Sequence, residues 1–299
     1  MARRMKFEKL VDTAWVNKLI HGGSLRSYKG NGYLIIEAVT GTPKNYLEGH
    51  IPGAISLDTN TFEREPSWNV IAAATLEQVL LAHGITQDKT VVLYGRNRFA
   101  ATRTALVLLY AGVKDVRLLD GGVKGWTASG FELETDSQET HPAKAFGVRI
   151  PAHPEFIIST DRAQALSTDK NAVLVCVRSW EEYIGVNSGY DYVRRKGRIP
   201  GSVWAGLPGN DQAHRDHYQN VDSFLRDPRE IAALWKEKGI TPDRKIAFYC
   251  GTGWRASEAF FYAYLMGWKD ICVYDGGWLE WSAQPDRLIE VGKPGEIMS

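Results

Sequence analysis

Cysteine is scarce in this chain, and its scarcity excludes several classes of protein. The 299 residues include three cysteines, Cys176, Cys250 and Cys272. An odd, small number in a chain of this length does not build a disulfide framework, and no CxxC pair or Cys/His cluster indicates zinc. We therefore expect no metal site and no cofactor.

An excess of charge of one sign and long hydrophobic runs are also lacking. The chain has 36 basic and 35 acidic residues, a formal net charge of +1, so we expect neither nucleic acid nor a membrane surface as a partner. No apolar run approaches the roughly 20 residues of a membrane span. Residues 1–8 are basic but no apolar segment follows, which argues against a signal peptide. We expect a cytoplasmic monomer; the periplasm stays open if the sequence begins after a removed segment.

What the chain does contain is one unit repeated twice. Residues Ala111–Gly122 match Met266–Gly277 at an offset of 155, and His50–Ala54 matches Arg198–Ser202 at an offset of 148. Copies this far apart are duplicated domains rather than a solenoid. The stretch between them is rich in Thr, Ser, charge and proline and has no periodicity, which is typical of a linker. We predict a first domain over residues 1–135, a linker over 136–153 and a second domain over 154–299.

Each copy alternates apolar runs that predict strands with segments that predict helices. The predicted strands are Tyr33–Ala38, Thr90–Tyr94, Val116–Leu119, Ala172–Val177, Lys245–Tyr249 and Ile271–Tyr274, and the predicted helices are Thr75–His83, Ala100–Ala111, Pro228–Lys238 and Ala256–Met266. Continuously apolar strands joined by helical crossovers indicate an α/β fold, with a mostly parallel sheet covered by helices on both faces. Ligands of such sheets bind beyond the carboxyl ends of the strands, where Cys250 falls.

The loop that begins at Cys250 has the composition of a nucleophile site. Cys250 follows a predicted buried strand, two glycines come within the next three residues, and a predicted helix follows. Glycine permits the backbone angles of a loop that curls around its own cysteine. Inward amides and the helix dipole then favour a thiolate and accept an anion. The offset of 155 places Gly95 at the equivalent point of the first copy, so we predict a single active centre, in the second domain.

Three motifs together carry a resemblance to a known family. They are His50–Ala54, the six-residue loop Cys250–Arg255 and the run Val273–Trp281. Over about residues 10–290 the chain resembles a tandem-domain rhodanese of the thiosulfate/3-mercaptopyruvate sulfurtransferase group, and its CGTGWR loop is similar to that of a bacterial subgroup. The resemblance implies that a sulfane sulfur moves from a donor to the Cys250 thiolate. A thiophilic acceptor, cyanide or a thiol, then removes it from the persulfide.

The resemblance also assigns roles within the loop. Cys250 is the predicted nucleophile, and the residues predicted to bind the sulfur donor through the loop are Gly251, Thr252, Gly253, Trp254 and Arg255. The hydroxyl of Thr252 either donates to the sulfur or stabilises a turn. Arg255 either faces the donor anion or is a solvated residue of the first helical turn. Trp254 either covers the edge of the site or packs against the first domain.

The sulfur donor is left open by departures from the family pattern. Asn60 stands where mercaptopyruvate-type enzymes carry a second acid, and Glu182 stands where thiosulfate-type enzymes carry a donor-binding arginine. Glu182 is expected to repel a dianion if it faces the pocket. An inserted basic stretch follows it, and we predict that Arg194 and Arg195 bind the donor in place of the missing residues. The alternative is an ordinary solvated basic loop.

Other residues are interpreted as structural. Cys176 and Cys272 lie in apolar runs and are predicted core residues; Cys176 replaces the acid of the usual Asp-x-Arg pair, whose arginine is Arg178. The equivalent positions of the first copy are Glu37 and Val39, so the usual ion pair is absent or rebuilt in both domains. We expect Asp275 to lie in a strand-end turn, and the tryptophans at 126, 278 and 281 to anchor packing.

Two other functions are compatible with the loop. A cysteine phosphatase places an arginine six residues after its cysteine, whereas Arg255 lies five after Cys250 and Ala256 lies six after it. A non-catalytic sulfur carrier or binding module with a rhodanese fold is the nearer alternative, because the first copy has already lost its nucleophile.

Overall fold

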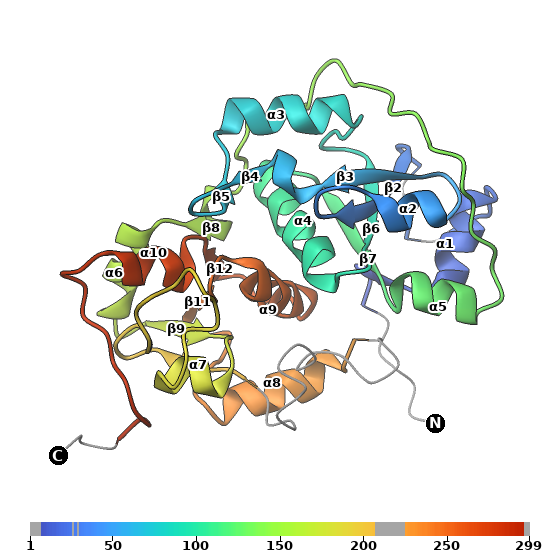
Figure 1. Ribbon diagram of the computed structural model, residues 1–299. Coiled ribbons are helices and arrows are strands. Elements are labelled where there is room, and N and C mark those ends of the chain that lie inside the picture. Colours follow the sequence, from blue (N-terminus) through green and yellow to red (C-terminus); the bar gives the residue numbers. More distant parts are fainter. Residues whose placement is uncertain (1–6, 26, 29, 207–224, 296–299) are drawn as a thin grey trace. The chain divides into compact units, whose positions relative to one another are not determined.

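The computed structural model describes residues 7–25, 27–28, 30–206 and 225–295, which form two compact units (Figure 1). The first unit holds most of the described residues up to Pro154, together with residues 225–227. The second holds the described residues from Glu155 onward apart from 225–227, and also residues 65–69. The residues that we predicted to form a linker, 136–153, thus lie with the first unit.

The elements of the first half alternate strands and helices from the start. They are β1 (Leu10–Val11), α1 (Thr13–Ile20), β2 (Tyr33–Val39), α2 (Lys44–Glu48), β3 (Ala54–Asp58), the 3₁₀ turn η1 (Thr59–Thr61), β4 (Glu63–Arg64), β5 (Asn69–Val70), α3 (Ala73–Ala82), β6 (Thr90–Tyr94), α4 (Arg98–Ala111), β7 (Asp115–Leu119) and α5 (Gly122–Ala128).

The second half repeats the order of the main strands and helices; its described residues add η2 at the start and hold no counterparts of η1, β4 and β5. Its elements are η2 (Pro154–Phe156), β8 (Ile157–Ile158), α6 (Thr160–Ser167), β9 (Ala172–Cys176), α7 (Trp180–Ile184), β10 (Val203–Trp204), α8 (Pro228–Lys236), β11 (Lys245–Tyr249), α9 (Trp254–Leu265), β12 (Ile271–Tyr274) and α10 (Gly277–Ala283). No helix among the described residues is long and apolar enough to cross a membrane.

Each unit is built on one five-stranded sheet, and the two sheets have equivalent strand orders. The first runs β1-β7-β6-β2-β3 and the second β10-β9-β11-β12-β8, which is the same order read from the other edge. The strand pairs within both sheets are parallel. The predicted α/β fold with two mostly parallel sheets is confirmed.

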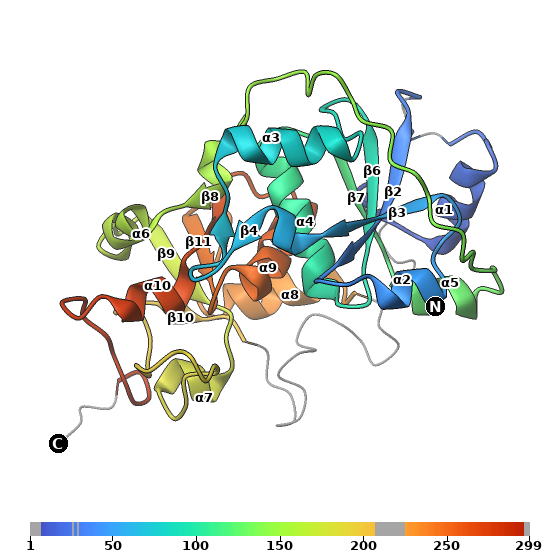
Figure 2. The same cartoon turned by 45° about the horizontal axis from the view of Figure 1, so that its top comes forward.

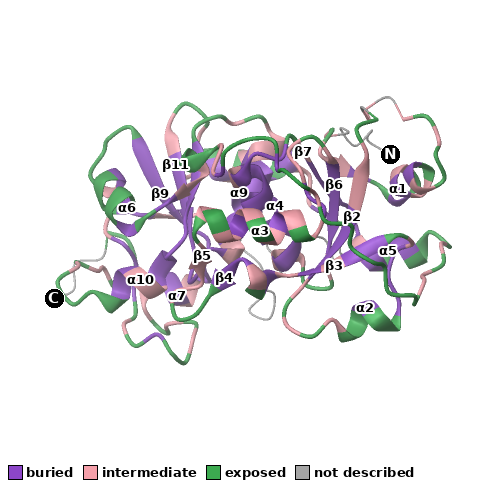
Figure 3. Cartoon of the chain, turned by 90° about the horizontal axis from the view of Figure 1, so that it is seen from above, coloured by how far each residue is buried: buried purple, intermediate pink, exposed green. Residues whose placement is uncertain are grey.

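Helices cover both faces of each sheet because the central strands are apolar on both sides. All five residues of β6 and all five of β9 are buried, and Figure 3 shows the strands as the buried layer. In the first unit α4 lies on one face and α1, α2 and α5 on the other (Figure 2). In the second unit α9 lies on one face of the sheet and α6, α7 and α10 on the other.

The predicted elements are confirmed with shifted ends, and the edge strands were missed. Strands β1, β8 and β10 have two residues each, too few to show a period. Strand β3 reads AISLD, in which polar residues interrupt the apolar run. Helix α9 begins at Trp254 rather than Ala256, so Trp254 and Arg255 belong to its first turn.

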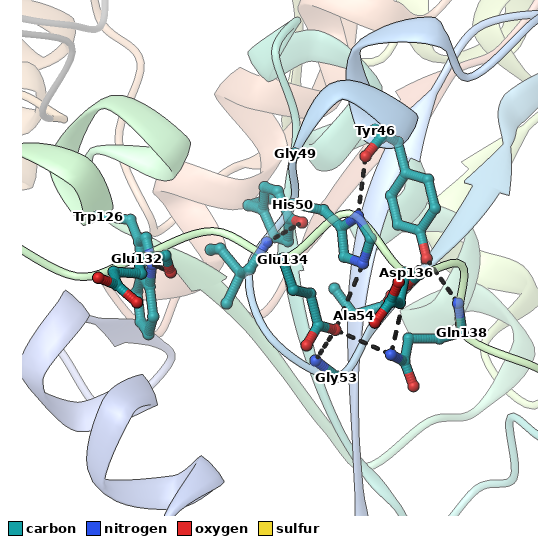
Figure 4. Close-up of polar contacts among 12 residues, drawn as sticks. Tyr46, Gly49, His50, Gly53, Ala54, Trp126, Glu132, Glu134, Asp136 and Gln138 are labelled. Carbon is teal, nitrogen blue, oxygen red and sulfur yellow. Dashed lines mark hydrogen bonds and ion pairs between the residues drawn. The ribbon is translucent and has the colours of Figure 1, made fainter.

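The chain after α5 folds back on the first unit through a buried histidine (Figure 4). The backbone of His50 exchanges two hydrogen bonds with that of Glu134, and Nε2 of His50 lies 3.4 Å from Oε1 of Glu134. The same oxygen accepts a 2.6 Å hydrogen bond from the amide of Gly53. Figure 4 also shows the His50 ring beside that of Tyr46, at a centroid distance of 3.9 Å.

The second unit repeats this brace with a different pair. Arg198 exchanges backbone hydrogen bonds with Glu290, and its Nε donates to Oε2 of that residue at 3.0 Å. The amide of Gly201 donates to the other carboxylate oxygen at 3.2 Å. The repeated Ile-Pro-Gly motif therefore marks, in both units, a turn held by a carboxylate that follows the last helix of that half of the chain.

The ion pair expected from the family pattern is rebuilt in the first unit from a different position. Glu37 is fully buried, and its Oε1 accepts a 3.1 Å hydrogen bond from Nε of Arg96. The guanidinium also donates to the carbonyls of Asn45 and Gly49. The arginine thus comes from the loop after β6, not from the position two residues after the acid.

Replacing Arg96 should destabilise the first unit. Arg96→Ala leaves the Glu37 carboxylate buried without its ion partner, and we expect a loss of about 3 kcal/mol in the free energy of unfolding. Lys114→Ala is the matched control: its pair with Asp88 has side chains 64% and 54% exposed, so we expect a change below about 1 kcal/mol. Urea unfolding of both variants checks this, and equal destabilisation would contradict it.

Candidate active site

The predicted nucleophile lies where β11 gives way to α9. Cys250 is fully buried and directly follows Tyr249, the last residue of β11. Tyr249 pairs in register with Cys176, the last residue of β9. The loop between β11 and α9 therefore stands at the carboxyl ends of adjacent parallel strands, where ligands of such sheets bind.

The start of α10 holds the carbonyls of this loop. The amide of Trp278 donates to the carbonyl of Cys250 at 2.7 Å, and the amide of Leu279 donates to the carbonyl of Gly251 at 3.0 Å. In a trans peptide the carbonyl and the following amide point in opposite directions. The amides of Gly251 and Thr252 are therefore turned away from α10, which leaves them available on the other side of the loop.

Two glycines make this geometry possible. Gly277 has φ +52°, and a Cβ there would lie 2.7 Å from the carbonyl oxygen of Cys250 and 2.6 Å from that of Gly251. Gly253 has φ +84° and is the residue before the first turn of α9. Both positions need left-handed backbone that side chains disfavour. The sequence predicts that Asp275 lies in a strand-end turn; the structure shows that the amides shortly after this turn, at Trp278 and Leu279, support the cysteine loop.

The Arg255 side chain is engaged within the protein. Its Nη1 donates to Oε2 of Glu182 at 2.7 Å and its Nη2 to Oε1 at 2.8 Å, a two-pronged ion pair. Nη2 also donates to the hydroxyl of Tyr190 at 3.1 Å. Glu182 therefore faces Arg255, the arginine of the loop, as a compensating charge.

Glu182 is itself fixed by the helix in which it lies. Its Oε2 accepts from the amide of Ser179 at 2.9 Å, while the Ser179 hydroxyl accepts from the amide of Glu182, which completes a capping box at α7. Burial opposes ionisation of this carboxyl, but the charge and hydrogen bonds of Arg255 outweigh it and lower its pKa. The carboxylate is thus a permanent negative charge beside the loop at neutral pH.

Tyr190 covers the loop from the inserted stretch of the second copy. A Cβ on Gly251 would lie 2.2 Å from Cε2 of Tyr190, so the ring packs directly on that glycine. Burial, with smaller contributions from the charges of Cys250 and Glu182, raises the pKa of Tyr190 to about 12. Burial and the Cys250 charge also raise the pKa of Tyr192, whose ring lies 5.3 Å from that of Tyr190. Both phenols are therefore neutral at neutral pH. The sequence signal for this contact is an aromatic residue in the inserted stretch, whereas the prediction for that stretch concerns its basic residues alone.

The structure does not bring the Arg195 guanidinium to the cysteine loop. It donates to the carbonyls of Gln284 and Arg287, beyond the end of α10. The carbonyl of Arg195 accepts from the indole of Trp278 at 3.0 Å, so this residue supports the element that holds the loop. Arg194 is exposed. Donor binding by Arg194 and Arg195 stays a prediction, as do the roles of the Thr252 hydroxyl and of the Trp254 ring, which is partly exposed.

Arg178 takes over the bracing role in the second unit. It is fully buried, its Nε lies 3.3 Å from Sγ of Cys176, and its Nη2 donates to the carbonyl of Gly197 at 2.6 Å. Its guanidinium also lies 4.7 Å from the ring centroid of Trp278. Gly197 is the counterpart of Gly49, to which Arg96 donates in the first unit. The two units thus satisfy one equivalent carbonyl with arginines from different chain positions.

The predictions for the two core cysteines and the three packing tryptophans are confirmed. Cys176 and Cys272 are fully buried, and the side chains of Trp126, Trp278 and Trp281 are at most 1% exposed. Among the residues that the structure describes, no group of three or more His, Cys, Asp or Glu side chains is placed to hold a metal ion.

The equivalent loop of the first unit lacks the thiol and is less closely contacted by the helix that follows its sheet. The side chain of Asn97 accepts from the amide of Phe99 at 3.0 Å and so caps α4. Gly122 shares the φ of +52° of its counterpart Gly277, but a Cβ there would lie 3.7 Å from the carbonyl of Gly95. The start of α5 therefore contacts the loop of the first unit less closely than the start of α10 contacts the loop of the second unit.

Fold and site together define a class of protein: a duplicated α/β chain with one thiol in a glycine-shaped loop, suited to covalent group transfer by a thiolate. The model of the rhodanese-like domain matches this chain twice, over residues 13–129 and 159–284. The chain belongs to the rhodanese-like family, as a tandem-domain member. The predicted family is confirmed.

Curated relatives carry names from sulfur transfer. The chain is 46% identical over 290 residues to thiosulfate sulfurtransferase YnjE of Escherichia coli, covering 97% of this chain and 66% of that relative. It thus spans slightly less than two thirds of that protein's length. It is also 30% identical over 284 residues to sulfur carrier protein TtuD of Thermus thermophilus, covering 92% of this chain and 93% of that one.

Solved structures of a second kind of sulfur enzyme are also similar. The wild-type structure of EanB superposes with a TM-score of 0.92 at 42% identity, covering 98% of this chain and 72% of that one. The anaerobic ergothioneine biosynthesis enzyme of Chlorobium limicola, in complex with trimethyl histidine, superposes with the same TM-score of 0.92 at 41% identity and with the same coverage of both chains.

Adding a methyl group at Gly277 should disturb the cysteine loop. Gly277→Ala pushes a Cβ against the carbonyls of Cys250 and Gly251, so the loop amides lose their alignment with the thiolate. A hydrogen bond to a charged group is worth about 1.5 kcal/mol or more, so we expect Cys250 to react about tenfold more slowly with methyl methanethiosulfonate. Mass spectrometry of the modified peptide measures this rate.

Gly122→Ala is the matched control for this prediction. It places the same substitution at the same φ in the first unit, with 3.7 Å to the nearest oxygen. We expect it to cost stability through backbone strain and to leave the rate at Cys250 unchanged. Equal rates in the two variants would show that the contact with α10 does not set the reactivity of the thiol.

Proposed function

We propose that this protein transfers a sulfane sulfur through a persulfide on Cys250. The observation that carries the proposal is the buried thiol in a loop whose carbonyls are held by α10 and whose amides face away from that helix. A thiolate and the persulfide that replaces it are both anions that such amides stabilise. Among the similar solved structures is one of EanB with a persulfide on its cysteine.

The proposed reaction has two displacements. The Cys250 thiolate attacks the transferable sulfur of the donor. In thiosulfate the S–S bond breaks and its electron pair leaves with sulfite; in 3-mercaptopyruvate the C–S bond breaks and its electron pair leaves with the enolate of pyruvate, which takes up a proton. The acceptor, cyanide or a thiolate, then attacks the outer sulfur of the persulfide and regenerates the Cys250 thiolate. No net oxidation is required, and each step exchanges one bond to sulfur for another.

Thiosulfate and 3-mercaptopyruvate are the two donors that the family offers. Thiosulfate is supported by the names of the relatives, and the departures at Asn60 and Glu182 weaken both family patterns. We propose that Gly251–Arg255 bind the donor or the persulfide through their amides. The Arg255 side chain is engaged with Glu182, which disfavours the phosphatase alternative, because a tetrahedral oxyanion needs a free arginine.

A second acceptor class is favoured by one feature of the site. The Tyr190 ring lies on the cysteine loop and the Glu182 carboxylate lies beside it. An aromatic face with a carboxylate suits a cationic acceptor, and similar EanB structures hold hercynine or ergothioneine. Incubating the persulfide form with hercynine and looking for ergothioneine by mass spectrometry tests this second function.

Removing the thiol should abolish transfer. After incubation with thiosulfate or 3-mercaptopyruvate, the wild-type protein should gain the mass of one sulfur atom, and Cys250→Ser should gain none. With cyanide present, the wild type should form thiocyanate at a steady rate. If sulfur loads and is never passed to cyanide, to a thiol or to hercynine, the sulfur-carrier alternative replaces the enzyme.

Cys272→Ser is the control for this experiment. Burial raises the pKa of the Cys272 thiol to about 12, and its Sγ lies 3.6 Å from the carbonyl of Ile246 inside the sheet. We expect loading and turnover of this variant to equal those of the wild type. Loss of loading in Cys272→Ser with retention in Cys250→Ser would refute the assignment of the nucleophile.

A further inference from the structure

The charge of Arg255 is already compensated before any donor arrives. The guanidinium and the Glu182 carboxylate are joined by two hydrogen bonds of 2.7 and 2.8 Å, and their side chains are 18% and 5% exposed. A pair so placed is little screened by solvent. The arginine of the cysteine loop is thus not a free anion receptor.

The carboxylate cannot swing away to release the arginine. The capping box with Ser179 fixes it from the side of α7. On the other side, a Cβ on Gly189 would clash with Oε1 of Glu182. The backbone of the inserted stretch therefore packs directly against the carboxylate at a position where only glycine, which has no Cβ, fits. Gly189 has φ +80°, a conformation suited to glycine.

The Arg255–Glu182 pair beside the nucleophile carries no net formal charge, and the Cys250 thiolate adds one negative charge. The high pKa values of Tyr190 and Tyr192 keep those phenols neutral. A donor with two negative charges therefore meets no net positive charge in this cluster. The attraction of each negative charge of the donor to Arg255 is offset by its repulsion from Glu182.

We propose that Glu182 is a specificity-determining residue, which holds Arg255 and selects against doubly negative sulfur donors in favour of singly negative or neutral ones. The inference rests on the proposed function and deepens it by naming the donor class. At neutral pH, 3-mercaptopyruvate carries one negative charge and thiosulfate two. The site therefore discriminates between the two family donors by charge.

Glu182→Gln isolates the charge from the structural role. Glutamine accepts the hydrogen bond from the Ser179 amide as glutamate does, and it is found in the same position of capping boxes. The substitution therefore preserves α7 and frees one unit of positive charge on Arg255. The repulsion removed from a dianion is twice that removed from a monoanion at the same place.

Steady-state transfer to cyanide, with each donor in turn, tests the proposal. For Glu182→Gln we expect the KM for thiosulfate to fall about tenfold and that for 3-mercaptopyruvate about threefold, with both changes shrinking as ionic strength rises. Asp270→Asn is the matched control: it removes one negative charge, from an exposed pair with Lys245 at the amino end of β11. We expect it to change neither KM.

Glu182→Asp separates charge from shape. It keeps the negative charge with a shorter side chain, so its donor preference should stay that of the wild type, whereas a purely structural role would make it behave as Glu182→Gln does. Equal changes of the two KM values in Glu182→Gln, or a rise in the KM for thiosulfate, would overturn the proposal.

A binding measurement keeps this test separate from that of the proposed function. Calorimetry compares thiosulfate binding to Cys250→Ser with binding to the double variant Cys250→Ser/Glu182→Gln, in neither of which sulfur transfer occurs. We expect about tenfold tighter binding in the double variant. Equal affinities overturn the role of Glu182 even if transfer is established, and tighter binding supports it even if the wild type proves to be a carrier that does not turn over.

Discussion

The reactive loop depends on two backbone hydrogen bonds, from the amides of Trp278 and Leu279 to the carbonyls of Cys250 and Gly251. They fix the direction of the loop's peptide planes, and planarity then decides where its amides point. The contact is possible because Gly277 carries no Cβ. The indole of Trp278, held by the carbonyl of Arg195, ties the same helix start to the inserted stretch. The chemistry of a single thiol is thus set by a segment more than twenty residues further along the chain.

The two units share one sheet topology, but only the second carries a cysteine in the loop. Both units have equivalent sheet orders, the same glycine φ at positions 122 and 277, and a carboxylate brace on the Ile-Pro-Gly turn. They differ at the brace beside the loop. In the first unit the loop itself supplies Arg96, which pairs with Glu37; in the second, Arg178 comes from the neighbouring strand end and its side-chain partner is the thiol of Cys176. Moving the arginine out of the loop leaves room at that position for Gly251, on which Tyr190 packs.

Electrostatic balance then distinguishes this site from a simple anion receptor. Two buried or half-buried arginines stand near the nucleophile, and in isolation they would attract any anion. The carboxylate of Glu182 removes this general attraction, and its capping box keeps it in place. In the proposed mechanism, the inserted stretch and α7 set the selectivity among sulfur compounds, while the loop sets the capacity to hold a thiolate or persulfide.

The sequence by itself determined the duplicated α/β fold, the central strands, the family and the single cysteine loop, because these rest on local periodicity, glycine spacing and a repeat visible along the chain. Edge strands of two residues escaped it, since so short a run carries no period. The tertiary structure alone decided the partners of the loop. Glu182 and Tyr190 lie 73 and 65 residues from Arg255 in the chain, and no local pattern reports which side chains such distances bring together. An acid that looked, in sequence, like an obstacle to anion binding proved to be the partner of the loop's own arginine, because chain folding, not residue type, chooses which charges meet.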